Sequence, residues 1–352
     1  MTRTFSPPSR PPAPVVLPAS RVHVRPAMSG DFPVRIETVA RTPDLAAHLR
    51  REREHVRSLL AADGAVLFRG FAVRSAEHFF DAIAALGVDI LRYSERSSPR
   101  HAVGDRVYTS TDHPADQHIV LHSEQSYTHD WPCYISFFCQ TPAATGGCTP
   151  IADNRRILQQ MPAGLIDRFE RHGVLYRRTY TPGLGVSWQT AFQTESRDEV
   201  EALCEARDIQ LSWEADGRLR TSQVRSAFQH HPVTGERLWF NHALFFHVTS
   251  LEPGLAQALI DAVGPDHLPT NTFFGHGAPF APADLSAMRE AVRIHTRRFE
   301  WQAGDVLVLD NMRCQHGRDP FTGERRVLTL MAHPHSTQGV PLSPPGQAPL
   351  QG

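Results

Sequence analysis

The sequence predicts a mainly β fold with flanking helices, in which a double-stranded β-helix core of the jelly-roll, cupin-like kind carries a large lid insertion. Short apolar runs bounded by glycine or turn residues recur along the chain and indicate strands. Segments with helical spacing lie between these runs. Strands that carry inward-pointing polar residues, with helices on the outside, are typical of a double-sheet barrel.

The individual elements follow from local patterns. Leu45, Leu49 and Val56 recur near helical spacing and predict a helix over residues 43–62. The apolar run 64–71 is bounded by glycines and predicts a buried strand. Further strands are expected at residues 134–139, 174–180 and 326–331, and further helices at 76–86, 154–172 (two short helices broken near Pro162), 199–207 and 282–296.

The domain organisation is expected to be one domain between two tails. Residues 1–30 are rich in proline, arginine and serine, and such a segment buries too little apolar surface to offset its ordering entropy, so a disordered tail is predicted. Residues 336–352 have the same character and the same prediction. The jelly-roll domain then spans residues 31–335, with residues 182–280 as the lid insertion.

Composition excludes several classes of protein. The chain has 352 residues and a formal net charge of −1, so it offers no general electrostatic attraction to nucleic acid or to a membrane surface. It has no long uncharged apolar run and no apolar segment typical of a secretory signal, so a cytoplasmic protein is expected. Its 5 cysteines form no C-x-x-C pair, which argues against a zinc ribbon or a disulfide framework.

The most informative motif is His122-Ser123-Glu124, the one histidine in this chain followed two residues later by a carboxylate. On a strand, residues i and i+2 face the same side, so the imidazole and the carboxylate would converge. Two histidines and one carboxylate form the facial triad that holds non-haem Fe(II) and leaves coordination positions open. His316, which follows the expected strand in the run 304–311, is the candidate third ligand, and a surface histidine beside a surface glutamate is the alternative.

Two longer stretches carry a family resemblance. The first includes residues 122–132, Thr141-Pro142 and residues 145–153; the second includes residues 301–311, His316-Gly317-Arg318 and Arg325-Arg326. Together they resemble the taurine dioxygenase/clavaminate synthase-like superfamily of Fe(II)- and 2-oxoglutarate-dependent oxygenases. Within it they are most similar to hydroxylases of peptide-antibiotic pathways, of the syringomycin-pathway aspartyl hydroxylase type.

The resemblance implies roles for particular residues. His122, Glu124 and His316 would be the metal ligands, with glutamate where many relatives have aspartate. Because related halogenases have a small residue in place of the carboxylate, Glu124 argues against halogenation. Arg326 would bind the C5 carboxylate of 2-oxoglutarate with help from the hydroxyl of Thr149, while Arg325 would point the other way.

Substrate contacts are less constrained. Some family members have a second arginine four residues after the cofactor arginine, where this chain has Leu330. Candidates for substrate contact are Tyr127, Asn241, His242 and Phe245, because Tyr127 follows the metal motif and residues 239–242 suggest a strand entering the barrel mouth. Packing is the alternative for each. Arg318 is expected to pair with an acid behind the metal site.

The expected function is hydroxylation of an unactivated C–H bond with release of succinate and CO2. By analogy within the subgroup, the substrate is an amino acid or an amino-acyl or peptidyl group, free or carrier-bound, in specialised metabolism. Desaturation, epoxidation and oxidative cyclisation use the same cofactors and stay open, as does the oligomeric state. A divalent-metal hydrolase or isomerase and a non-catalytic jelly-roll binding module are the rival classes.

Overall fold

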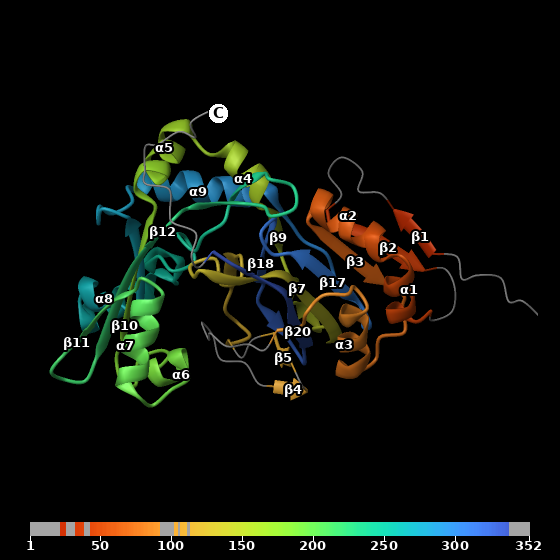
Figure 1. Ribbon diagram of the computed structural model, residues 1–352, viewed down its shortest axis with the longest axis horizontal. Helices are drawn as coiled ribbons and strands as arrows, with labels where there is room; N and C mark the ends of the chain where they lie inside the picture. Colours follow the sequence, from red (N-terminus) through yellow and green to blue (C-terminus); the bar gives the residue numbers. More distant parts are fainter. Residues whose placement is uncertain are drawn as a thin grey trace, which may run out of the picture.

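The computed structural model describes residues 22–25, 32–38, 43–91, 102–104, 106–110 and 113–337. The two tails expected to be disordered lie largely outside these residues. The described part is rich in β-structure with helices around it, as predicted (Figure 1). Its largest sheet has eight strands in the order β1 (Val22–Arg25), β2 (Val34–Thr38), β3 (Ala65–Arg69), β17 (Val306–Asp310), β7 (Asp130–Thr141), β20 (Arg326–Ser336), β5 (Val107–Thr109), β4 (Ala102–Gly104).

The central strands of this sheet are buried on both faces. Val306 and Val308 of β17 join one apolar cluster, whereas Leu307 and Leu309 join another on the opposite face. This explains why these strands are nearly continuous apolar runs instead of alternating ones. The first cluster packs the sheet against three helices: α1 (Leu45–Arg51), α2 (Arg53–Asp63) and α3 (Ala76–Ala84).

The opposite face packs on a second sheet of four strands. Its order is β16 (Thr296–Arg297), β9 (Ile151–Asp153), β18 (Cys314–Arg318), β6 (Ile119–His122). Ile151 and Cys314 from this sheet share an apolar cluster with Leu67, Ile135 and Leu307 from the large sheet. The two sheets therefore face each other across one core, and the paired strands β6 and β18 carry the two candidate histidine ligands.

A third sheet lies apart from this core, on the left in Figure 1. Its order is β11 (Gln210–Trp213), β12 (Leu219–Arg225), β10 (Val174–Tyr180), β15 (Thr270–Phe274). The elements around it are the hairpin β13 (Phe228–His230) and β14 (Arg237–Trp239), the short helices η1 (Val248–Ser250) and η2 (Pro265–His267), and α6 (Trp188–Phe192), α7 (Arg197–Ala206) and α8 (Pro253–Val263). Since β10 belongs to this sheet, the separate unit begins before residue 182, the predicted start of the lid.

Three further helices pack against this unit. They are α4 (Asn154–Gln160), α5 (Ala163–His172) and α9 (Pro282–His295). Ile157, Leu165 and Met288 from these helices pack in one cluster with Tyr176 of β10 and Trp239 of β14. The helices therefore anchor the third sheet above the metal end of the core.

Most expected elements are confirmed, with some boundaries corrected. The strand at residues 174–180 is β10, and the two helices broken near Pro162 are α4 and α5. The helix expected over residues 43–62 is interrupted at Glu52, whose φ of −101° and ψ of 19° leave the helical range. The strand expected at residues 239–242 ends at Trp239.

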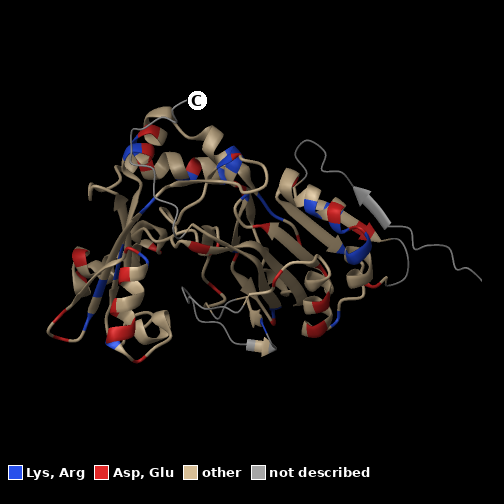
Figure 2. Ribbon diagram, viewed as in Figure 1, with Lys and Arg blue, Asp and Glu red and all other residues tan. Residues whose placement is uncertain are grey.

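Basic and acidic residues are interspersed over the described elements (Figure 2), and the net charge of the full sequence is −1. Among the described residues, no helix is long and apolar enough to cross a membrane.

Truncating the core between the sheets should destabilise the fold. Leu309 is fully buried, so Leu309→Ala is expected to lower the free energy of unfolding by about 3 kcal/mol through lost burial and the cavity left behind. Urea denaturation measures the change. Leu255→Ala on α8 is the control, since Leu255 is 43% exposed; equal losses in both variants would contradict the assignment of the core.

Candidate metal centre

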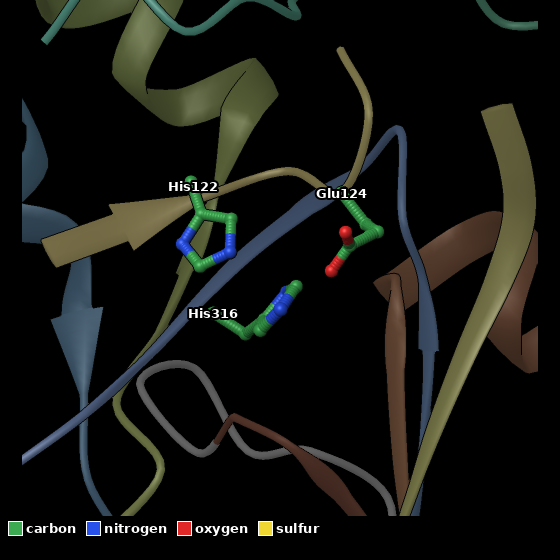
Figure 3. A group of neighbouring side chains, drawn as sticks. All are labelled: His122, Glu124 and His316. Atoms are coloured by element: carbon green, nitrogen blue, oxygen red, sulfur yellow. The ribbon is translucent and has the colours of Figure 1, made fainter. Parts of the chain in front are cut away.

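The two candidate histidines lie side by side on paired strands. His122 is the last residue of β6 and pairs in register with His316 on the antiparallel strand β18. Their ring centroids are 4.6 Å apart. Strand pairing therefore brings together two residues that are far apart in sequence (Figure 3).

Glu124 reaches the same place by a route that the sequence did not predict. Strand β6 ends at His122, so Ser123 and Glu124 lie in a turn and the argument from strand alternation is wrong. Asn311, fully buried just after β17, holds this turn: its Oδ1 accepts a hydrogen bond from the Glu124 N–H at 2.7 Å, and its Nδ2 donates to the Glu124 carbonyl at 2.9 Å. The same Nδ2 donates to the carbonyl of Pro132 at 2.9 Å, which ties the turn to β7.

The three side chains form a donor set that suits a divalent metal. One ligand atom from each of His122, Glu124 and His316 lies within 4.8 Å of the others, and all three residues are buried (Figure 3). Nδ1 of His122 is 2.9 Å from the Val120 carbonyl, an arrangement that places the proton on Nδ1 and the lone pair on Nε2. Two imidazole nitrogens and one carboxylate are the set preferred by non-haem Fe(II).

Three of the four predicted substrate contacts lie against this centre. The Phe245 ring stacks on the His122 ring with centroids 4.1 Å apart, and the His242 ring meets His122 edge-on at 5.7 Å. Tyr127 contacts the far side of His242, at 4.9 Å between centroids. Nδ1 of His242 is 2.6 Å from the Ser126 hydroxyl, and burial together with the neighbouring His122 lowers the pKa of His242 well below its usual value.

Asn241 has a different surrounding from the one predicted. Its side chain donates to the Ala227 carbonyl at 2.8 Å and accepts from the Ala243 N–H at 2.9 Å. Because both ends of the amide are engaged by backbone, Asn241 fixes the turn after β14. Its contact with substrate stays a prediction that this geometry disfavours.

The two adjacent arginines are placed opposite to expectation. Arg326 is exposed, whereas Arg325 is partly buried and donates from Nε to the Gly147 carbonyl at 3.0 Å. Arg325 precedes β20, and the pairing of β20 with β7 shifts register between Arg326 and Val327, so burial rather than strand alternation distinguishes the two side chains. The prediction that Arg326 points inward is therefore wrong. Burial lowers the pKa of Arg325 to about 10, with the neighbouring Arg318 contributing, and it stays cationic at neutral pH.

Thr149 and Arg318 flank the same end of the core. Thr149 is buried, and its hydroxyl accepts a hydrogen bond from the Trp301 indole at 3.1 Å. Arg318 is buried, and its guanidinium donates to the carbonyls of His113, Pro114 and Gln117; no carboxylate of the described residues lies within ion-pair distance of it. The predicted ion pair is wrong because a backbone loop supplies neutral acceptors instead.

Sequence reasoning missed the positioning role of Asn311 and the inward direction of Arg325. Asn311 stands in the quoted motif Asp310-Asn311, and a buried amide directly after an apolar strand is a signal that could have found it. For Arg325 the signal was weak, because Val327-Leu328-Thr329-Leu330-Met331 is apolar on both faces apart from one threonine.

Comparison with known proteins gives concordant matches. Residues 30–331 match the model of the family described as taurine catabolism dioxygenase TauD, TfdA family. The chain is 38% identical to the dapdiamide synthesis protein DdaC of Enterobacter agglomerans, over 89% of this chain and 94% of the relative. It is 31% identical to a clavaminate synthase-like protein of Arabidopsis thaliana, over 80% of this chain and 86% of the relative.

Solved structures share the fold at low identity. One is PvcB of Pseudomonas aeruginosa, described as an Fe, alpha-ketoglutarate dependent oxygenase from an isonitrile synthetic pathway; the TM-score is 0.51 at 16% identity, over 89% of this chain and 91% of that one. Another is AAD-2 in complex with Mn(II) and N-oxalylglycine, with a TM-score of 0.52 at 12% identity, over 91% of this chain and 100% of that one.

Removing the Asn311 amide should weaken metal binding. In Asn311→Ala the turn that carries Glu124 loses its backbone partners, so the Kd for Mn(II) should rise about 10- to 100-fold. Titration calorimetry measures it. Asn271→Ala is the matched control, since Asn271 also accepts from backbone N–H groups, of Val248 and Thr272, but in the third sheet. An unchanged Kd in a folded Asn311→Ala variant would refute the positioning role.

Proposed function

The chain belongs to the taurine catabolism dioxygenase TauD/TfdA family, and we propose that it hydroxylates an unactivated C–H bond of an amino acid or an amino-acyl or peptidyl substrate in a natural-product pathway. It is an iron- and 2-oxoglutarate-dependent oxygenase, as the resemblance of its motifs implied. The observation that carries the proposal is the buried cluster of His122, Glu124 and His316, which provides the donor set for iron.

The residues around the cluster prepare the site for this chemistry. Bound iron and 2-oxoglutarate together activate O2 and yield succinate and CO2, while the protein supplies positioning and shielding. We propose that the three ligands hold the metal on one side and leave the other open to co-substrate and oxygen. The stacked ring of Phe245 and the buried rings of His242 and Tyr127 keep bulk water from the side facing the third sheet.

Arg325 replaces Arg326 in our proposal for the 2-oxoglutarate anchor. A guanidinium binds a carboxylate through two parallel charge-assisted hydrogen bonds, and Arg325 is the inward-facing one of the pair. Arg318 lies near enough to lower its pKa, so two cations favour an anion at this end of the core. Thr149 stays in the proposal as the hydroxyl that contacts the same carboxylate, since accepting from Trp301 leaves its proton available to donate.

The substrate class rests on the relatives. The name of DdaC assigns it to dapdiamide synthesis, which supports a small amino-acid-like substrate in an antibiotic pathway. Free and carrier-borne forms of such a substrate are both compatible with the site. The same cofactors support desaturation, epoxidation or oxidative cyclisation, so the product distinguishes these outcomes from hydroxylation.

The finer fold assignment also belongs to this proposal. We infer that the two facing sheets are the two halves of a double-stranded β-helix, with the third sheet as its lid. The support is the shared cluster between the sheets and the metal ligands on β18 and beside β6 at the edge of the smaller sheet.

Loss of one imidazole ligand should abolish turnover. His122→Ala leaves two ligands, so 2-oxoglutarate-dependent succinate formation should fall at least about 100-fold. Chromatographic measurement of succinate tests this. His230→Ala, an exposed histidine on β13, is the control and should keep wild-type activity; full turnover in His122→Ala would sink the metal assignment.

Substitutions of Arg325 and Arg326 should have different effects on the affinity for 2-oxoglutarate. Arg325→Met is expected to raise the Kd of the Mn(II)-loaded protein for 2-oxoglutarate at least about tenfold, because two charge-assisted hydrogen bonds are lost. Arg326→Met, an exposed arginine next to it, should change little. Calorimetry under nitrogen measures both values, and the reverse order of effects would restore Arg326 as the anchor.

A further inference from the structure

A second chamber lies beside the metal centre, within the unit built on the third sheet. It has a volume of about 250 Å³. Its walls are the segment 127–130 that follows the metal motif, the inward face of β10 and β12, and residues of and around α6 and α7. Tyr127 belongs to this wall and also contacts His242, which in turn contacts His122. Tyr127 thus borders the chamber and links it, through His242, to the metal site.

The sheet face that forms one wall is buried yet polar. Thr221, Gln223 and Arg225 alternate along β12 on its covered side and are 8%, 9% and 5% exposed. The same face carries Leu219 and, on β10, Tyr180, which pack beneath α6 and α7. A covered sheet face is ordinarily apolar, because burying polar groups without partners costs free energy. Polar residues at these positions indicate a polar ligand in the chamber.

Hydrogen bonding in this wall is incomplete. No hydrogen bond joins the side-chain amide of Gln223 to any other residue that the structure describes. Arg225 donates from its Nη atoms to the carbonyls of Arg207, Asp208 and Val224, but its Nε has no partner among the described residues. Buried polar groups in native proteins are nearly always satisfied, so unsatisfied ones that line a chamber mark a place where a ligand supplies partners.

Among the described residues that line the chamber, basic side chains outnumber acidic ones. The basic residues are Arg178, Arg207 and Arg225, and the acidic one is Asp130. Within the described parts of the chain no carboxylate lies within ion-pair distance of Arg225. Burial lowers the pKa of Arg225, and the charge of Asp208 offsets only part of this effect. Arg178 lies over the Tyr180 ring at 4.9 Å and the Tyr127 ring at 5.9 Å, at the side of the chamber nearest the metal centre.

We propose that this chamber binds an oxyanion of the substrate, a carboxylate or a phosphate, through Arg178 and Arg225, with Gln223 as an added hydrogen-bond donor. This deepens the proposed function and rests on it. The anionic group lies beyond Tyr127 from the iron, so the substrate is elongated and its charge stands several bonds from the carbon that is oxidised.

The test uses two probes that differ only in charge. Acetyl-L-alanyl-L-alanine and its C-terminal amide have nearly equal size and hydrogen-bonding backbone, and only the first carries a carboxylate. Full-length protein is loaded with Mn(II) and 2-oxoglutarate under nitrogen, so that the iron and co-substrate sites are filled, and each probe is titrated by calorimetry. The acid is expected to bind at least about tenfold more tightly than the amide.

Two neighbouring arginines on β10 provide a matched pair of variants. Arg178→Met should remove most of the preference for the acid, whereas Arg177→Met should keep it. Arg177 lies on the opposite face, over the Phe273 ring at 4.6 Å, and does not line the chamber. Arg225→Met should act as Arg178→Met does, but Arg225 also holds three backbone carbonyls, so the pair on β10 decides the matter if that variant does not fold.

Inorganic phosphate distinguishes the source of the oxyanion. If phosphate displaces the acid from the wild-type protein but not from Arg178→Met, the result supports the site. If phosphate binds more tightly than the acid, the site is assigned to a phosphorylated substrate. The proposal is overturned if the acid and the amide bind equally, if neither anion binds, or if both β10 variants lose the preference for the acid to the same extent. The affinity for 2-oxoglutarate, measured in the same preparations, separates these outcomes: if it is intact, only the chamber is refuted, and if it is absent, the proposed function fails as well.

Discussion

The site depends first on the hydrogen bonds that join the Asn311 side chain to the turn that carries Glu124. Strand β6 ends at His122, so no ladder of hydrogen bonds holds the carboxylate ligand, and Gln125 beyond it adopts a left-handed φ of 55°. Asn311 supplies both a donor and an acceptor to Glu124, and it is fixed in turn by Asp310, which binds His231 at 2.8 Å and accepts from the Met312 and Arg313 N–H groups. A fully satisfied buried network of this kind is rigid, which a ligand in a turn requires.

The two-sheet core gives this network its frame. Antiparallel pairing of β18 with β6 fixes the histidines, and β17 delivers Asp310 and Asn311 between β3 and β7. The cationic groups divide between two places: Arg325 and Arg318 at the end near Gly147, and the arginines of the chamber beyond Tyr127. In our proposals the first of these places binds the co-substrate and the second binds the anionic group of the substrate.

Much of the fold, and the clustering of three side chains, could be predicted from sequence because they follow from local patterns. Apolar runs predict β3 and β17, alternation predicts β10, and the H-x-E motif with the distant His316 names three residues that the structure brings together. The inward direction of Arg325 could not be predicted from the sequence. The strand that follows it, β20, is buried on both faces, so its apolar residues do not distinguish one face from the other. The chamber could not be predicted from the sequence either. Arg178 and Arg225 are 47 positions apart, and the pairing of their strands is a property of the tertiary fold.

The most direct measurement is the visible spectrum of the metal-free protein after addition of Fe(II) and 2-oxoglutarate without oxygen. Chelation of iron by the keto acid within the cluster of His122, Glu124 and His316 should give a weak metal-to-ligand charge-transfer band that bleaches when O2 is admitted and succinate forms. No band, combined with tight zinc binding and no succinate, would contradict the oxygenase and favour a divalent-metal hydrolase on the same three ligands.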